Sequence, residues 1–416
     1  MTVLHVDANS AYLSWTAVKL LEQGYSEDIR NIPSVIAGDP DRRQGIVLAK
    51  SIPAKRYGIR TGTGLFEAVR LCPGLLVFPP DYDLYLSCSE AMYGILQEYS
   101  PTVQRFSIDE CFADLAGCAE DAADAEHTAY IIKERIKKEL GFTVNVGVGS
   151  NKLLAKMAGE LQKPDKVHTL LNRREIEEKL WPLPVGELFM AGRASVKKLN
   201  GINIRTIGEL ANSDVFLLRR ILKSHGQLLW EYANGIDRSQ VIPNQYIVQK
   251  GLSNGMTLPC DVTEAEEAEQ YILALSDRVT GRLRRLGCRA SQLGIAVKTS
   301  GFCRYTHRMQ LPFYLDDTTQ IYRYFSRLFE ECWRGEPVRQ LSVHLTDLVR
   351  NDQCQMTFYD MQRVSEDQAL NRVVDQIRIR FGQNAIYRGT FVNMDMKPLE
   401  GGVNDGNYMI MGGYKQ

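Results

Sequence analysis

The stretch RFSIDECFADL, residues 105–115, places two adjacent carboxylates, Asp109 and Glu110, inside an otherwise apolar segment. The alternation of apolar residues around them is typical of a half-buried strand. Burying one unpaired carboxylate in such a strand costs so much free energy that the group would rather take up a proton. Two adjacent acids therefore need a cation nearby, or else the segment is a tight turn with both acids in water. Both interpretations are open at this point.

Length and charge limit the classes of protein to consider. A chain of 416 residues is too long for one compact core, which predicts about two to four domains. Its 50 Lys and Arg residues balance 50 Asp and Glu residues, so binding of nucleic acid would depend on local basic patches. No apolar run approaches the ~18 residues that span a bilayer, and the N-terminus lacks the basic flank of a signal peptide. We expect a cytoplasmic protein without a membrane partner, and the nine cysteines, which lack metal-type spacing, to be reduced thiols.

The first part of the chain predicts an antiparallel sheet backed by helices. A buried strand at 3–6 ends at Asp7, and later segments follow the order strand, helix, strand, strand, helix, strand. This order is typical of a ferredoxin-like α+β fold. The segment 22–76 interrupts it as an inserted subdomain.

In the rest of the chain the pattern of predicted elements changes twice. Short helices begin at about 168, and residues 236–245 have no apolar period and indicate a linker. Residues 246–350 repeat the strand-helix-strand-strand-helix-strand order. The tail, 351–416, contains one further predicted helix, which Ser365 would cap and Gly382 would end.

Three acids, Asp7, Asp109 and Glu110, thus stand at strand ends or turns of one predicted sheet. Carboxylates that converge on Mg²⁺ ions held ~3.5–4 Å apart form a two-metal phosphoryl-transfer site. Magnesium prefers oxygen ligands and shares its shell with substrate phosphates, so two or three protein carboxylates suffice. Lys55 and Lys163 are candidate phosphate ligands, although a solvated surface lysine is the alternative for each.

Two further segments are candidates for DNA contact. The stretch 192–210 predicts two short helices around a tight turn at Gly201, which resembles a helix-hairpin-helix with Lys197 and Lys198 beside it. An ordinary helical hairpin is the alternative. Arginines of a later helix and strand, chiefly Arg282, Arg285 and Arg304, would supply a second phosphate-contacting face.

Together these segments resemble the Y-family of translesion DNA polymerases over roughly residues 1–350. The motifs HVDANSAYLSW, SIDECFADL and GVGSNKLLAKMAGELQKPD occur in the family's order and spacing. The DAN after the first strand and the AK in IPAK resemble more closely the catalytic subunit of polymerase V and its plasmid- and phage-borne relatives in ultraviolet-damage repair. The resemblance implies a right-hand polymerase with these parts: a ferredoxin-like palm (1–21 and 77–167), small fingers (22–76), a helical thumb with the helix-hairpin-helix (168–235), a linker (236–245), an α/β little finger (246–350) and the tail (351–416).

The resemblance also implies roles for single residues. Asp7, Asp109 and Glu110 would be the catalytic metal ligands, with the backbone carbonyl of Ala8 added. Tyr12 would be the steric gate against ribonucleotides, and Lys55 and Lys163 would bind the triphosphate. The implied cofactor is a pair of Mg²⁺ ions, with Mn²⁺ as a substitute.

The implied partners are primer–template DNA, dNTP and the bacterial sliding clamp, with a recombinase filament or accessory subunit as a further requirement of the polymerase V branch. The segment QCQMTFYD resembles the short clamp-docking peptide, with Gln355, Met356, Phe358 and Tyr359 as its contact residues. The enzyme would work in the cytoplasm, on the nucleoid when engaged on DNA.

Two alternative functions are weighed against a lesion-bypass DNA polymerase. A nucleotidyl cyclase or other untemplated nucleotidyltransferase would share the palm but would have no use for a duplex grip. A catalytically inactive DNA-binding or clamp-binding scaffold would have no need of three acids, two phosphate lysines and a gate tyrosine.

Overall fold

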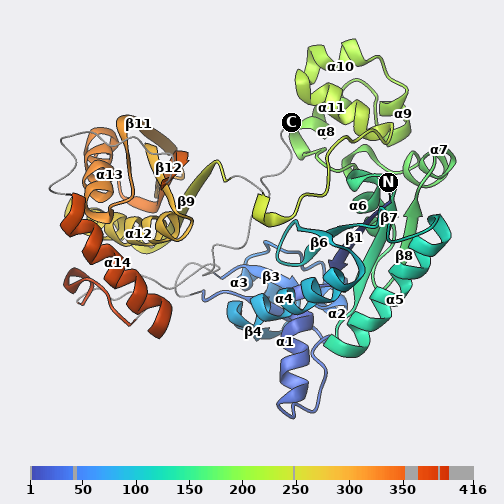
Figure 1. Ribbon diagram of the computed structural model, residues 1–416, viewed down its shortest axis with the longest axis horizontal. Helices are drawn as coiled ribbons and strands as arrows, with labels where there is room; N and C mark the ends of the chain where they lie inside the picture. Colours follow the sequence, from blue (N-terminus) through green and yellow to red (C-terminus); the bar gives the residue numbers. More distant parts are fainter. Residues whose placement is uncertain (1, 41–44, 247–248, 352–363, 383–384, 393–416) are drawn as a thin grey trace. The chain divides into compact units, whose positions relative to one another are not determined.

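The computed structural model describes residues 2–40, 45–246, 249–351, 364–382 and 385–392, which fall into two compact units. The first unit runs to residue 247 and the second follows it, apart from residues 39–45, which group with the second. Figure 1 labels the helices and strands of both units. Within the described part of the chain, no helix is both long and apolar enough to cross a membrane.

A five-stranded sheet with the order β5-β6-β1-β7-β8 forms the centre of the first unit. Its strands are β5 (Thr102–Arg105), β6 (Glu110–Asp114), β1 (Val3–Ala8), β7 (Val144–Gly149) and β8 (Val167–Leu170). With α4 (Tyr82–Tyr99) and α5 (Ala122–Leu140), the first four strands form the predicted ferredoxin-like arrangement. The prediction of an α+β fold is therefore confirmed.

Strand β8 lies where the sequence predicted the start of the helical region. It pairs with β7 in parallel, so the expected boundary at 168 falls inside a strand of the central sheet. The four residues Val-His-Thr-Leu are buried only at their two ends, and so short a run carries no readable period of two.

The two faces of β1 have different neighbours. Leu4, Val6 and Ala8 belong to the apolar cluster that includes the buried residues of α4 and α5. Helix α6 (Lys152–Glu160) covers the opposite face, where His5 and Asp7 lie. Because side chains alternate along a strand, β1 joins the apolar core on one face to the polar site on the other.

Two glycines bring α6 close to the sheet. A Cβ atom on Gly147 would lie 1.9 Å from the carbonyl oxygen of Ala155, and one on Gly149 would lie 2.1 Å from the Ala155 nitrogen. The backbone of α6 therefore rests directly on β7, and any side chain at either glycine position would push the helix away. This contact fixes the height at which the lysines of α6 stand over the sheet.

The remaining elements of the first unit form two satellites of the central sheet. One is a three-stranded sheet with the order β3-β2-β4, of which β2 and β3 lie within the predicted insertion and β4 extends past its expected end at residue 76. Its elements, with α1 leading into it, are α1 (Ala11–Glu22), β2 (Ser34–Ala37), β3 (Val47–Lys50), α2 (Ile52–Arg56), α3 (Leu65–Leu71) and β4 (Leu76–Phe78). The other is a helical cluster built from α7 (Arg173–Glu175), η1 (Ile176–Leu180), η2 (Val185–Glu187), α8 (Arg193–Asn200), α9 (Ile207–Ala211), α10 (Val215–Leu222) and α11 (Ser224–Ala233).

The predicted linker, residues 236–245, is attached to the first unit along much of its length. Val241 is buried against Phe106 and Phe112, and the Asp237 carboxylate accepts a hydrogen bond from the Leu153 backbone nitrogen at 3.1 Å. The segment contains no strand or α-helix, and it ends in the short helix η3 (Asn244–Tyr246). The absence of an apolar period therefore reflects an irregular segment that packs on the sheet through single residues.

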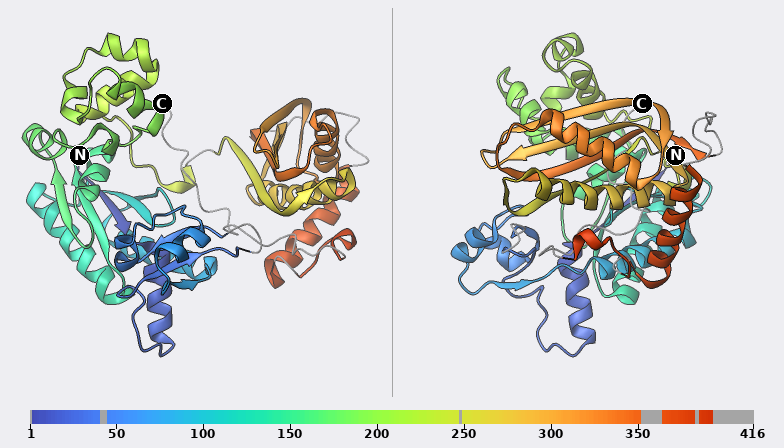
Figure 2. Two further views of the ribbon diagram at one scale, coloured as in Figure 1. Left: turned by 180° about the vertical axis from the view of Figure 1, so that it is seen from behind. Right: turned by 90° about the vertical axis from the view of Figure 1, so that its left-hand side faces the viewer.

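The second unit contains the predicted repeat of strand, helix, strand, strand, helix, strand. Its elements are β9 (Gly251–Val262), α12 (Ala265–Arg285), β10 (Cys288–Thr299), β11 (Arg304–Leu315), α13 (Thr318–Cys332) and β12 (Val338–Arg350). The strand order is β11-β10-β12-β9, and α12 and α13 pack on one face of the sheet (Figure 2).

The tail helix α14 (Val364–Phe381) docks on the second unit through charged side chains. Arg378 donates to Asp277 at 2.7 Å, and Arg284 pairs with Asp375 at 2.6 Å. The helix starts one residue before the predicted cap, so Ser365 lies inside it, and it ends as predicted before Gly382, whose φ is 94°. A short helix, η6 (Gly389–Phe391), follows, and Phe391 is buried against Leu273 and Ala274.

Candidate active site

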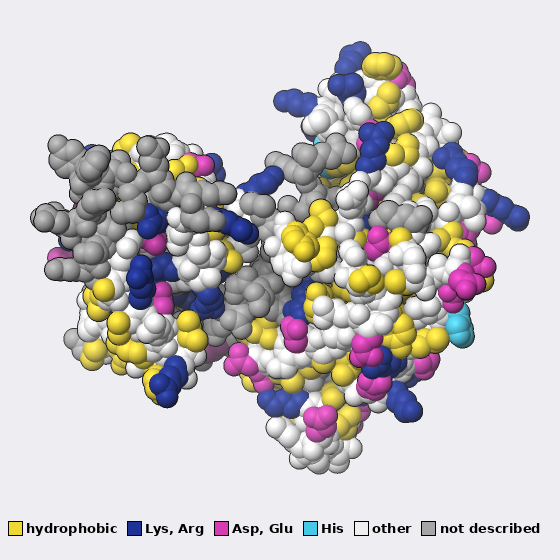
Figure 3. All heavy atoms as spheres, viewed as in Figure 1, with side chains coloured by type: hydrophobic (Ala, Val, Ile, Leu, Met, Phe, Trp, Pro, Cys, Tyr) yellow, Lys and Arg dark blue, Asp and Glu magenta, His cyan; other side chains and the backbone are white. Residues whose placement is uncertain are grey.

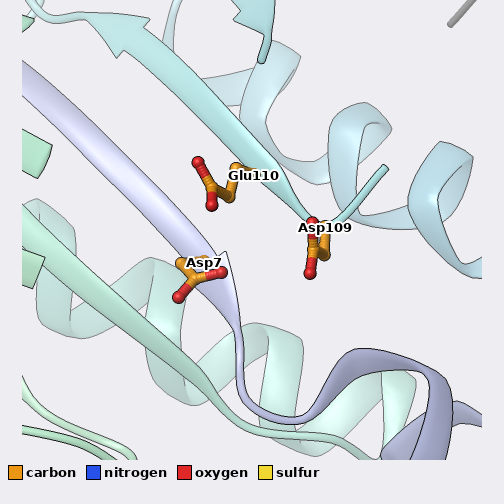
Figure 4. A group of neighbouring side chains, drawn as sticks. All are labelled: Asp7, Asp109 and Glu110. Atoms are coloured by element: carbon orange, nitrogen blue, oxygen red, sulfur yellow. The ribbon is translucent and has the colours of Figure 1, made fainter. Parts of the chain in front are cut away.

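Three carboxylates converge at one end of the central sheet. Asp7 of β1 lies directly opposite Glu110 of β6 in the antiparallel register, and Asp109 precedes β6 in the turn. Oxygens of all three lie within 4.8 Å of one another, and Figure 4 shows the side chains pointing toward a common space. Among the described residues, no other group of His, Cys, Asp or Glu has this geometry.

Like charges placed directly across a strand pair repel, and burial makes the repulsion stronger. Burial raises the pKa of Asp7 to about 7, with the charges of Glu110 and Asp109 adding to the effect and Lys163 opposing it. Burial also raises the pKa of Asp109, although the Ser107 hydroxyl donates to its Oδ1 at 2.5 Å. An all-oxygen cluster of three neighbouring carboxylates fits a hard divalent cation, because the cation would supply positive charge among them.

Glu110 is the exception in this cluster, because two donors already hold it. Lys156 Nζ donates to Glu110 Oε2 at 2.6 Å, and His5 Nε2 lies 3.2 Å from the same oxygen. Burial alone would raise the pKa of Glu110, but the hydrogen bond of His5 and the charge of Lys156 lower it overall. Glu110 therefore stays ionised beside two other acids.

Lys163 stands at the edge of the cluster. It donates to Asp7 Oδ2 and, at 2.8 Å, to Glu160 Oε1. Burial disfavours its charge, but the Asp7 carboxylate raises its pKa overall. The loop that carries it is held by Asn145, which lies opposite Asp7 in the sheet and donates to the carbonyls of Gly159 and Gln162.

Tyr12 lies in the first turn of α1, just beyond Asp7. Its ring stacks on Tyr85 with centroids 4.3 Å apart and planes inclined by 5°. Burial, together with the negative charge of Asp109, raises the pKa of Tyr12 to about 12. The backbone nitrogen of Ala8 donates to the Asp109 carbonyl at 3.0 Å and so ties the end of β1 to the acidic turn.

The second predicted phosphate lysine is placed differently. Lys55 is exposed on α2 of the inserted subdomain, where burial of the nearby Lys50, together with the charge of Lys55, lowers the pKa of Lys50. None of its described hydrogen bonds or ion pairs reaches the three acids. The structure thus brings Lys163, but not Lys55, into direct contact with the carboxylate cluster.

The candidate DNA-contact residues lie on three separate surfaces. Lys197 and Lys198 are in the last turn of α8, with Gly201 as its C-cap. Arg304 is exposed on β11, whereas Arg282 and Arg285 belong to α12, which covers the other face of that sheet. On the face drawn in Figure 3, Lys and Arg side chains lie scattered among acidic ones, in keeping with the even charge balance.

Sequence reasoning missed His5 and Lys156, and it named a segment that the structure does not describe. The signal for Lys156 was its position in the apolar helix LLAKMA, where a lysine would be buried and so needs a partner. His5 lies in the apolar run VLHV, and a histidine buried in such a strand also needs a polar partner. The predicted clamp-contact residues, Gln355, Met356, Phe358 and Tyr359, lie outside the described residues.

Two family models cover most of the chain. The impB/mucB/samB family matches residues 6–160, and the C-terminal domain of the same family matches residues 249–358. The DNA polymerase IV of Clostridium acetobutylicum is 45% identical over 395 residues, which are 95% of this chain and 99% of that protein. DNA polymerase IV 1 of Bacillus subtilis is 33% identical and covers 96% of this chain and 95% of its own length.

Solved structures give the same fold. A Y-family DNA polymerase chimera of Dbh and Dpo4 aligns with a TM-score of 0.74 at 19% identity and covers 84% of this chain and 100% of its own. A Dbh ternary complex aligns with a TM-score of 0.59 at 18% identity, with the same shares.

These matches correct one expectation and establish the family. The closer resemblance to the polymerase V branch is not supported, because the relatives named above are DNA polymerases IV. The short motifs DAN and IPAK were too few residues to separate two branches that share all the longer motifs. The chain belongs to the impB/mucB/samB family and is a DNA-directed DNA polymerase of the Y-family.

Proposed function

We propose that this chain carries out low-fidelity, template-directed DNA synthesis across damaged template bases, with its chemistry at Asp7, Asp109 and Glu110. The observation that carries the proposal is the convergence of three carboxylates, buried Asp7 and the partly buried Asp109 and Glu110, whose oxygens lie within 4.8 Å of one another. Its relatives named DNA polymerase IV support the templated reaction.

In this proposal Asp7, Asp109 and Glu110 hold two Mg²⁺ ions, with the Ala8 carbonyl as a further ligand and Mn²⁺ as a substitute. When bound, such ions lower the pKa of the attacking primer 3′-hydroxyl and stabilise charge on the triphosphate. The three side chains supply the negative charge and fix the positions of their oxygens before substrate arrives. The raised pKa values of Asp7 and Asp109 support this role, because both carboxyls lack enough positive charge around them.

Lys163 would exchange partners during the reaction cycle. It donates to Asp7 and Glu160, and this position at the edge of the cluster supports a contact with the incoming triphosphate. Lys55, from the inserted subdomain, would contact the same triphosphate. Tyr12 would lie against the deoxyribose, because its ring is fixed by stacking on Tyr85 and a 2′-hydroxyl would collide with a ring that cannot move.

The proposed division into parts follows the family. Residues 1–21 and 77–170 form the palm, extended to include β8, and 22–76 form the fingers. Helices after β8 form the thumb with the α8–α9 hairpin, whose Lys197, Lys198 and Gly201 would contact phosphates. The second unit is the little finger, where Arg304 on the open sheet face would follow the duplex backbone, and Arg282 and Arg285 of α12 would contact phosphates from a separate surface.

The experiment is single-nucleotide primer extension with purified protein and Mg²⁺ on four templates that differ at one base. Incorporation that follows the template base supports a polymerase, and extension on a template with an abasic site supports lesion bypass. Untemplated addition would instead favour a nucleotidyltransferase. Binding of primer–template without any incorporation, even with Mn²⁺, would favour a scaffold.

Partners are proposed from the tail. Gln355, Met356, Phe358 and Tyr359 would dock on the bacterial sliding clamp while the enzyme works on the nucleoid in the cytoplasm. Deleting residues 355–359 should abolish stimulation by the clamp and leave distributive synthesis unchanged. Stimulation that survives the deletion would contradict the docking peptide. A parallel assay with a recombinase filament would show whether an activator is needed as well.

A further inference from the structure

Glu110 differs from the other two acids in how its carboxylate is held. Both of its described polar contacts end on one oxygen, Oε2, where Lys156 Nζ lies at 2.6 Å and His5 Nε2 at 3.2 Å. Asp7 instead meets Nζ of Lys163, and Asp109 meets the hydroxyl of Ser107. One oxygen of Glu110 is therefore held by two donors, which restricts the rotation of its carboxylate.

His5 acts as a hydrogen-bond donor in this arrangement. It is fully buried, and its Nε2 lies 3.2 Å from Glu110 Oε2. A carboxylate only accepts hydrogen bonds, so the proton of this bond is on Nε2. The other ring nitrogen, Nδ1, is buried without a hydrogen-bond partner, a cost that the fold accepts in order to place the donor.

Lys156 is held by aromatic rings as well as by charge. Its residue is 8% exposed, and its Nζ lies 5.1 Å from the centre of the Phe106 ring and 5.5 Å from that of Phe189. Phe106 belongs to the segment that leads into the acidic turn, and Phe189 belongs to the helical cluster, between η2 and α8. The ammonium thus touches the acidic turn, the helical cluster and Glu110 at once.

We propose that His5 and Lys156 are positioning residues for the metal site. They orient Glu110 for its metal ligation, and the ring of Phe189 holds Lys156 in place, so that the helical cluster helps to set the geometry of the site. This inference rests on the proposed function, because it takes Glu110 to be a metal ligand.

For removal of Lys156, we expect a change in cation affinity opposite in sign to the change that charge alone would cause. Lys156 places a positive charge against a proposed ligand, so by Coulomb's law alone its removal would tighten cation binding. If Lys156 orients Glu110, its removal frees the carboxylate to rotate and weakens binding instead. Partners of this kind typically contribute about 10- to 100-fold in metal affinity or activity.

The test measures Mn²⁺ affinity by electron paramagnetic resonance in the ternary complex with dideoxy-terminated primer–template and dNTP, so that no turnover occurs. Lys156→Met should bind Mn²⁺ at least about ten-fold more weakly than the unchanged protein. The matched control is Lys152→Met, which removes a buried lysine one turn away whose ammonium bonds Gln104 instead of Glu110, and which should leave Mn²⁺ affinity unchanged. Mn²⁺ binding by Lys156→Met that equals or exceeds that of the unchanged protein would overturn the proposal.

A second pair of variants serves if Lys156→Met does not fold. His5→Leu should weaken Mn²⁺ binding, and His5→Gln, which keeps an amide donor, should restore most of it; equal affinities in the two would overturn the role of His5.

Phe189→Ala should weaken Mn²⁺ binding more than Phe189→Leu does. Equal Mn²⁺ affinities in these two variants would contradict the role of the helical cluster in positioning Lys156. Asp109→Ala separates the two levels: if it retains full Mn²⁺ affinity, the proposed metal site itself is wrong.

Discussion

The two sheets share one order of elements but use their faces in different ways. In the first unit, β1 and β7 are short and buried along their whole length, because helices cover both faces. In the second, β11 spans 12 residues with alternating exposure, because α12 and α13 cover only one face. The first arrangement holds three carboxylates close together at buried and partly buried positions. The second leaves a long open surface suited to a polymer.

The open face of the second sheet carries exposed arginines. Arg304 and Arg308 stand on the edge strand β11, whereas Gly294 and Ala296 at the centre of the sheet are buried. Burial lowers the pKa of His344 on β12, two strands away from β11, and the charges of Arg304 and Arg308 add to this effect. Because the two sheets differ in this way, we expect separate substitutions to remove catalysis at the first sheet and DNA binding at the second.

The largest expected effect is at the carboxylate cluster. Asp7→Ala should lower the rate of incorporation by about 1,000-fold or more, because metal-ion stabilisation of the reacting phosphate is worth several kcal/mol. Affinity for primer–template should be unchanged, since the site contributes little to the grip. Single-turnover incorporation at saturating DNA measures the rate. A comparable rate in the variant would mean that Asp7 is not a metal ligand.

Lys163→Ala should come next. Loss of a charged contact to the triphosphate, worth ~1.5–3 kcal/mol, should raise the Kd for dNTP by about 10- to 100-fold. Lys137→Ala is the matched control, because Lys137 pairs with Asp165 two residues from Lys163 and is half exposed. Equal dNTP affinity in both variants would exclude the triphosphate contact.

Tyr12→Ala should lower discrimination against ribonucleotides by about ten-fold or more, because steric exclusion in a fixed pocket is of that order. Tyr12→Phe keeps the stacked ring and should keep the discrimination. The ratio of kcat/KM for dNTP and the matching rNTP measures the effect. The same ratio in Tyr12→Ala as in the unchanged enzyme would mean that Tyr12 does not exclude ribonucleotides.

The smallest single effect is expected on the open sheet. Arg304→Ala should weaken primer–template binding a few-fold and reduce the salt dependence of log Kd by about 1, because one phosphate contact is lost. The control is Arg327→Ala, on α13, whose guanidinium is exposed and pairs with Glu331. If both variants show the same small change, the open face has no special role in the grip.

The existence of the helices and strands was predicted better from the sequence than their boundaries along the chain. The buried strand at 3–6, the alternation around residues 105–115 and the periodic helices α5, α12 and α13 identified both α+β repeats, because long regular patterns dominate local signals. Strand β8 was missed because a run of four residues is too short to show a period of two. The packing of the predicted linker on the first unit was missed because Val241 is buried as a single residue, without a pattern around it.

The site was only partly readable from sequence for a similar reason. The three acids stand at strand ends, which a pattern reveals, and the structure brings them together. His5 and Lys156 reach Glu110 only through the register of β1 with β6 and the close approach of α6 at Gly147 and Gly149. Such contacts depend on tertiary packing, which no spacing along the chain specifies.

The most direct test compares Asp109→Ala with the double variant Arg304→Ala and Arg308→Ala in one experiment. For each protein, the Kd for primer–template and the single-turnover incorporation rate at saturating DNA would be measured together. The account predicts that Asp109→Ala loses the rate and keeps the Kd, whereas the double variant weakens binding and keeps the rate. Loss of both properties in either variant, or full incorporation by Asp109→Ala, would contradict the assignment of chemistry to the first sheet and grip to the second.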